Sequence, residues 1–310
     1  MLLDGGASSF AFDLATTPLQ GGVDLGVLSL MTTTSLFGAT FGFGDAIIAI
    51  PLLALLFNVE VAQAAPLQTI VSSCLGVLIL LVDAQGEASG RSGAKIGRYG
   101  ESLVLFAAAA VGVPFGVQVL VSVDPGLIRA VVGCVLVLYG AWALATGGEL
   151  AAAATESDAP TPRPRAGDSS AGDAADDAAA AASGADWALP PTALPFGLVA
   201  GSLCGAVGEP GPVAILYGQL QKWPPLVLRG MLARFFLPVQ CVTLREFYVQ
   251  GLLTDGILEQ SLASLPSVVV AVAIGTKLNR AFDPARFATA VDGLVVGLGC
   301  ICLYSAFAGV

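Results

Sequence analysis

The stretch that decides the fold is Gly38–Pro51, GATFGFGDAIIAIP, which follows a run of apolar residues. A second stretch of the same kind is Gly201–Pro212, GSLCGAVGEPGP. Each places glycines where a membrane helix would be continuous, and each sets an acid directly after a glycine, Asp45 in the first and Glu209 in the second. Glycine and proline interrupt the backbone hydrogen bonds, and lipid cannot satisfy the freed groups, so such a break must be buried in protein or line a wet cavity. Matching breaks in two halves of an apolar chain are typical of a transporter's binding site.

The composition indicates a membrane protein. Of 310 residues, 55% are hydrophobic and 12% are charged, and the mean hydropathy is +0.82. Soluble domains have roughly a quarter of their residues charged. Apolar blocks near 20 residues long recur along the chain, enough to cross a hydrocarbon core of about 30 Å. Because the blocks are continuously apolar rather than alternating, they predict an all-α polytopic membrane protein and argue against a β-barrel.

The residue types that most enzymes need are scarce. The chain has no histidine, and its six cysteines lie inside apolar blocks without a CxxC pair. There is no GxSxG motif either. A zinc site or a Ser-His-Asp arrangement is therefore disfavoured. We expect no catalytic residues, no metal, no cofactor and no enzymatic activity.

Four segments are expected from the changes in composition. Residues 148–190 are rich in Ala, Asp, Pro, Ser and Gly and hold eight of the 23 acids, which predicts a disordered acidic linker. It separates a first transmembrane repeat, 23–147, from a second, 191–310, and an N-terminal segment, 1–22, precedes both. Ten apolar blocks are expected within the repeats: 23–44, 46–57, 61–82, 102–121 and 127–146, then 192–207, 213–220, 226–250, 257–276 and 287–308.

The two repeats align with each other. Gly44-Asp45 matches Gly208-Glu209, and Asp124-Pro125 matches Asp283-Pro284 in the same order. Each repeat then holds a broken or re-entrant helix pair followed by three transmembrane helices. Because Asp124 and Asp283 fall on opposite faces of the membrane in the topology given next, the repeats are expected to be inverted.

Basic residues set the predicted topology. With the polar loop 83–100 inside the cell, the linker is cytoplasmic, the segment 1–22 is extracellular, and ten of the thirteen Lys and Arg residues are cytoplasmic. This requires that each broken pair, 23–57 and 192–220, begins and ends on the same side. We expect a multi-pass protein of the cell membrane.

Several of these motifs carry a resemblance to a known family. In the first half they are GATFGFGD followed by AIIAIPLLALL, then AAPLQTIVSSCLGVLI; in the second they are GSLCGAVGEPGP, VLRGMLARFFL and GTKLNRAFDPARFATAVDGLVVGLG. The chain resembles the TauE/SafE sulfite exporter-like family of membrane permeases. The resemblance implies transport of sulfite, sulfonates or related small anions. Asp45 and Glu209 depart from the family pattern, which has glycine or a small residue there.

Glycines at the breaks are the first candidate site residues. Gly42, Gly44, Gly205 and Gly208 free backbone N–H groups at the start of a half-helix, and these groups together with the helix dipole favour an anion. The alternative is close helix packing, for which membrane proteins also use glycine.

The two acids have two interpretations each. Asp45 is expected either to be the N-cap of the half-helix 46–57 or to be a coupling site for a proton or sodium. Glu209 has the same alternatives, but Pro210 and Pro212 beside it lack N–H groups, so capping gains less there and a functional role is favoured.

Arg234 lies eight residues into the block 226–250, or about 12 Å deep at 1.5 Å per residue. We expect it to be buried, either as the countercharge of the anion or in a structural ion pair with Glu209 or Asp45.

Thr69, Ser72 and Ser73 give hydroxyl groups to a central helix. They either line the pathway or bond back to their own helix. The predicted function is a secondary transporter for a small anion, working by alternating access around two broken helices. The alternatives are a non-transporting membrane scaffold or accessory subunit, or an intramembrane enzyme. The expected partners are the anion, the lipid bilayer and a coupling proton or sodium, with an oligomer possible and no nucleic acid.

Overall fold

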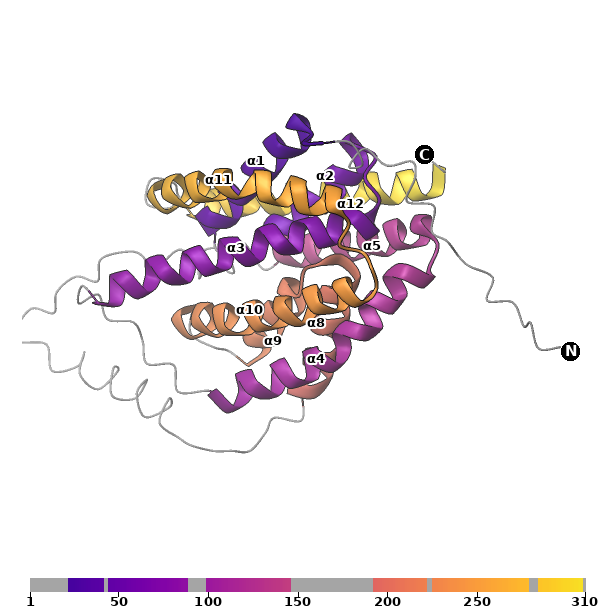
Figure 1. Cartoon of the computed structure of the whole chain (residues 1–310). Helices are drawn as coiled ribbons and strands as arrows, with labels where there is room; N and C mark the ends of the chain where they lie inside the picture. The colour runs from indigo at the N-terminus through magenta and orange to yellow at the C-terminus, as the bar shows by residue number, and fades with distance from the viewer. Residues whose placement is uncertain are drawn as a thin grey trace, which may run out of the picture.

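A computed structural model describes residues 22–41, 44–88, 99–145, 192–221, 225–278 and 284–308. Within these ranges the chain forms ten α-helices and no strand (Figure 1). Two short helices followed by three long ones occur twice, so the predicted all-α fold is confirmed. The helices are α1 Leu25–Phe41, α2 Asp45–Leu56, α3 Val61–Ala88, α4 Tyr99–Ser122 and α5 Pro125–Ala145, then α8 Ala193–Val207, α9 Gly211–Leu220, α10 Pro225–Val249, α11 Asp255–Leu278 and α12 Pro284–Ala308.

Every predicted apolar block overlaps one of these helices. One boundary was wrong: the loop predicted over 83–100 is shorter, because α3 continues to Ala88 and α4 already begins at Tyr99. The residues 83–88 are mostly polar but continue α3, because a helix that leaves the hydrocarbon can continue in water. The predicted linker 148–190 and residues 1–21 lie outside the described residues.

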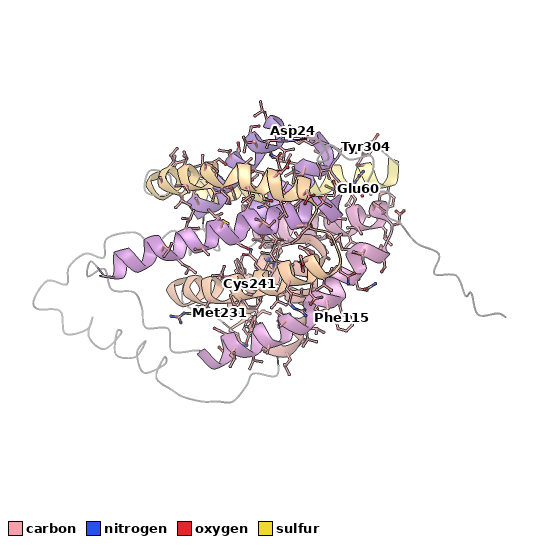
Figure 2. The ribbon with its side chains drawn as sticks, in the orientation of Figure 1. Asp24, Glu60, Phe115, Met231, Cys241 and Tyr304 are labelled. Carbon is pink, nitrogen blue, oxygen red and sulfur yellow. The ribbon has the colours of Figure 1, made fainter. Side chains whose placement is uncertain are left out.

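Four of the described helices are long and apolar enough to cross a membrane, and several shorter ones are apolar throughout. Their outer faces carry large apolar side chains. Leu103 of α4 is 65% exposed. Phe115 of α4 and Tyr304 of α12, which Figure 2 labels, are 64% and 74% exposed. A soluble surface of this kind would aggregate, whereas lipid solvates it. The chain is a multi-pass membrane protein. The four spans are Val61–Leu81, Glu101–Ser122, Pro125–Ala145 and Asp255–Gly275.

The inner face of α4 approaches α8 through glycines. A Cβ added at Gly201 would overlap the carbonyl oxygen of Ala109, and one added at Gly112 would overlap that of Leu198. Because lipid tails are as apolar as leucine, close van der Waals packing rather than the hydrophobic effect holds such helices together. Small residues are therefore required along this contact.

Each broken helix pair folds back on itself. A Cβ at Gly26, near the start of α1, would overlap the ring of Phe57, which follows α2. In the second pair, Gln221 after α9 donates a 3.2 Å hydrogen bond from Nε2 to the Thr192 hydroxyl before α8. The two ends of each pair therefore lie close together, as the predicted topology requires, and their side of the membrane stays a prediction.

The fourth helix of each half, α4 or α11, packs against helices of the other half, and this arrangement is called the helix exchange below. The helix α11 packs against α1 and α3, while α4 packs against α8 and α10, and α5 packs against α12. Gln260 of α11 fixes the first contact by two hydrogen bonds to the backbone of Asp24, at 2.8 and 3.1 Å. The sequence did not predict this exchange. The matched pairing is what a two-fold relation between the halves produces, and the inversion across the membrane stays a prediction.

We expect Gly201→Ala to lower the free energy of unfolding by about 1–3 kcal/mol, because the new methyl group overlaps the backbone of α4. Thermal melting of the detergent-purified protein measures this. Gly297→Ala on α12 is the matched control, since a Cβ there meets nothing within 4 Å. Equal melting temperatures for the two variants would contradict the packing account.

Cysteines introduced at Thr192 and Gln221 are expected to react with a membrane-impermeant maleimide from the cytoplasmic side. One introduced at Asp124 is expected to react from outside, since it lies in a turn at the other end of the spans. Labelling of intact against permeabilised cells separates the two cases, with the parent chain as the control for its native cysteines. Labelling of the Thr192 and Gln221 positions from opposite sides would show that this pair crosses the membrane.

Candidate functional site

The two breaks have the same local backbone. Gly44 has φ of 87° and Gly208 has φ of 72°, a left-handed conformation that glycine adopts without steric cost. Each glycine is followed directly by an acid that is 5% exposed, Asp45 or Glu209. The repetition of both the turn and the acid supports the alignment of the two repeats.

Asp45 is held by the neighbouring helix α3. Its Oδ2 accepts hydrogen bonds from Gln68 Nε2 at 2.8 Å and from Ser72 Oγ at 2.6 Å. The predicted N-cap position is wrong by one residue, because the left-handed Gly44 occupies the cap and Asp45 is the first residue of α2. Its carboxyl group still interacts with the backbone N–H groups of Asp45 and Ala46. The acid thus helps the helix start and also binds α3.

Glu209 supports the start of the half-helix at the second break. Its Oε1 accepts a 2.8 Å hydrogen bond from the N–H of Gly211, the one N–H between Pro210 and Pro212. Glu209 therefore stabilises the start of α9 despite the prolines.

Helix α3 lies against both breaks. A Cβ added at Gly208 would sit 2.8 Å from the hydroxyl of Thr69 and 3.2 Å from the carbonyl oxygen of Ala65. One turn further along the helix, Gln68 and Ser72 hold Asp45. Since these α3 residues lie within two turns of one another, the two breaks converge on a single short segment of α3, residues 65–73.

Two of the three candidate hydroxyl groups in this segment bond back to their own helix. Thr69 and Ser73 donate to backbone carbonyl oxygens of their own helix, at 2.7 and 2.6 Å, as the back-bonding alternative predicted. Ser72 instead donates to Asp45. Ser73 Oγ also lies 3.3 Å from Gln240 Oε1, which connects α3 to α10.

The candidate glycines do not all lie at the breaks. Gly44 and Gly208 form them, whereas Gly205 packs against the backbone of Val113 and Val117 on α4. Close packing, the alternative, therefore describes Gly205. Gly42 lies outside the described residues.

The structure contradicts the prediction that Arg234 is buried. Its side chain is exposed, and the hydrogen bonds described for Asp45 and Glu209 go to other groups. The neighbouring Phe235 is fully buried. Consecutive residues of a helix point about 100° apart, so depth along α10 does not decide which side of the helix faces the core.

Two buried amides were missed as site residues. Gln68 is fully buried on Asp45, and Gln240 is 5% exposed beside Ser73. The sequence could have indicated both residues, because a glutamine inside an apolar block needs polar partners within the protein. The spacing of Gln68 and Ser72 by four residues places both on one helix face.

A helical multi-pass protein with two broken helices that meet at a buried polar site has the architecture of a secondary transporter. The comparisons agree with this class. The sequence profile described as Sulfite exporter TauE/SafE matches residues 19–301, and the chain belongs to that family, whose members are membrane transporters for sulfite and related anions. The predicted resemblance is confirmed. No curated protein and no solved structure matches the chain.

The contact between Thr69 and Gly208 allows a double-mutant test. Gly208→Ala is expected to lower the melting temperature more than Gly44→Ala, since both residues have positive φ but a Cβ at Gly44 meets nothing closer than a ring carbon of Phe37 at 3.5 Å. Adding Thr69→Ala should restore part of the loss in Gly208→Ala, with a coupling on the order of 0.5–3 kcal/mol. When Thr69→Ala is combined with Gly44→Ala, the two losses of stability should add. If the losses also add for Thr69→Ala with Gly208→Ala, the result would contradict the contact between α3 and the second break.

Proposed function

We propose that the protein is a permease for a small anion such as sulfite, a sulfonate or a related organic anion, and that it works by alternating access around the two breaks. The observation that carries this proposal is the convergence of both breaks on α3. Gly208 abuts Thr69, and Asp45 accepts hydrogen bonds from Gln68 and Ser72. A site shared by both repeats can face either side of the membrane as the repeats move.

The chemistry of the site suits an anion. The half-helices α2 and α9 begin at the breaks, where the positive end of each helix dipole favours negative charge. Ser72 and Gln68 of α3 donate to Asp45, so they hold this acid beside the start of α2. Because Arg234 is exposed, the proposed anion site rests on the helix starts and on neutral groups of α3.

The exchanged helices suggest which parts move. One group holds α1, α2, α3 and α11, and the other holds α8, α9, α10 and α4. Each group is tied internally, the second by the glycine contacts between α4 and α8. A change in how α3 meets α10 would open the shared site first to one side and then to the other.

The remaining attributes are part of the same proposal. The protein lies in the cell membrane, with residues 1–22 outside and the linker 148–190 in the cytoplasm. It has no enzymatic activity, and a proton or sodium drives the transport.

Uptake of radiolabelled sulfite into proteoliposomes tests the function. Vesicles loaded with unlabelled sulfite are expected to exchange it for the label, and a panel of sulfate, methanesulfonate and acetate as competitors defines the substrate class. Ser72→Ala should reduce exchange by on the order of tenfold, since it removes the hydroxyl group that holds Asp45 beside the start of α2. Ser267→Ala is the matched control, because that hydroxyl bonds only to its own helix among the described contacts.

Absence of exchange for every anion in the panel, by protein that melts cooperatively, would overturn the permease and favour a non-transporting membrane subunit.

A further inference from the structure

The unexplained feature of the site is its negative charge. Asp45 and Glu209 are each 5% exposed and directly follow the two breaks, Gly44 and Gly208, that lie against the α3 segment 65–73. Their described hydrogen bonds come from Gln68, Ser72 and the N–H of Gly211, none of which carries a positive charge. Two carboxylates that repel each other in a buried site are strongly disfavoured unless one of them is neutralised.

The elements packed around the pair supply no described cation. Helix α3 contributes Gln68, Thr69 and Ser72, and α1 contributes Gly38, whose Cα lies against Asp45.

Two further elements face Glu209. On α10, Phe236 is near Gly211. On α8, Cys204 is the other titratable group that interacts with Glu209, and its Sγ already accepts a hydrogen bond from Thr243. The groups described beside the two acids are therefore neutral.

A second observation points to what is missing. The Oε1 of Gln68 is buried and has no hydrogen-bond partner among the described residues. Its amide is held at Asp45 by the bond from Nε2, so this unpaired acceptor lies at the acid pair. A carboxylate accepts hydrogen bonds but has none to give, whereas a protonated carboxyl group is a donor. A proton in the pair would both remove one charge and supply a donor to this cluster.

We propose that Asp45 and Glu209 share one exchangeable proton, and that this proton crosses the membrane with the anion. This rests on the proposed permease function and names its coupling ion. The proton is taken from water on one side and released to water on the other, and no other bond changes. An anion at the half-helix starts adds a third negative charge beside the pair, so anion and proton each favour the binding of the other.

Proteoliposomes loaded with the pH indicator pyranine test the proposal. The voltage is clamped with potassium and valinomycin, and the probes are methanesulfonate and sulfate, which stay fully ionised near neutral pH and carry no proton themselves. An inward gradient of a transported probe is expected to acidify the vesicle interior. An imposed acid-outside gradient should in turn drive accumulation of the labelled probe.

The variants separate coupling from transport. Glu209→Gln keeps the shape of a protonated acid but has no proton to exchange, so the ratio of anion-driven acidification to anion exchange should fall by on the order of tenfold or more. Asp255→Asn is the matched control, because it removes an exposed acid at the start of α11 and should leave both readouts unchanged. Asp45→Asn provides a second test of the pair.

Three results would overturn the proposal: exchange by the wild-type protein without acidification, accumulation driven by a sodium gradient and not by a pH gradient, or full acidification in Glu209→Gln. The wild-type result decides the question if the variants fail to fold. Absence of any anion exchange would instead overturn the permease itself, and the inference with it.

Discussion

A helix that breaks inside a membrane leaves backbone groups that lipid cannot satisfy, and the rest of this structure depends on how two such breaks are covered. Glycine makes each break possible, since Gly44 and Gly208 have positive φ. The acid after each glycine interacts with the freed N–H groups, and α3 lies over both breaks. Because the backbone groups freed at each break need hydrogen-bond partners inside the protein, both breaks pack against α3.

The packing of the helices makes this arrangement possible. Because small residues let α4 and α8 approach closely, the fourth helix of one half becomes part of the other half's group. The same exchange places α11 on α1 and α3. Each of these two groups is held together by close backbone contact, and the two meet mainly where α3 touches α10, beside the polar site. Under the proposed mechanism, motion between them would act directly on the proposed anion site.

The sequence predicted those features that depend on local chemistry. Apolar length predicted the ten helices, and the glycine-acid pairs predicted the breaks. What it missed depends on direction around a helix or on contacts between distant segments. Arg234 was placed by its depth along α10, yet its neighbour Phe235 faces the core instead. Gly205 was assigned to the site because it precedes a break, although its Cα faces α4. The role of Gln68 was missed because it depends on a contact with Asp45 of another helix. The helix exchange was missed for the same reason, since one sequence alone does not show which helices pack together.

The central claim is that both breaks and α3 form one anion site. An electron cryomicroscopy structure of the protein in lipid nanodiscs with sulfite present tests it most directly. The account predicts density for one small anion between the starts of α2 and α9, within hydrogen-bonding reach of the segment 65–73. Density for sulfite at another place, with the space between the two breaks filled by protein side chains, would contradict it.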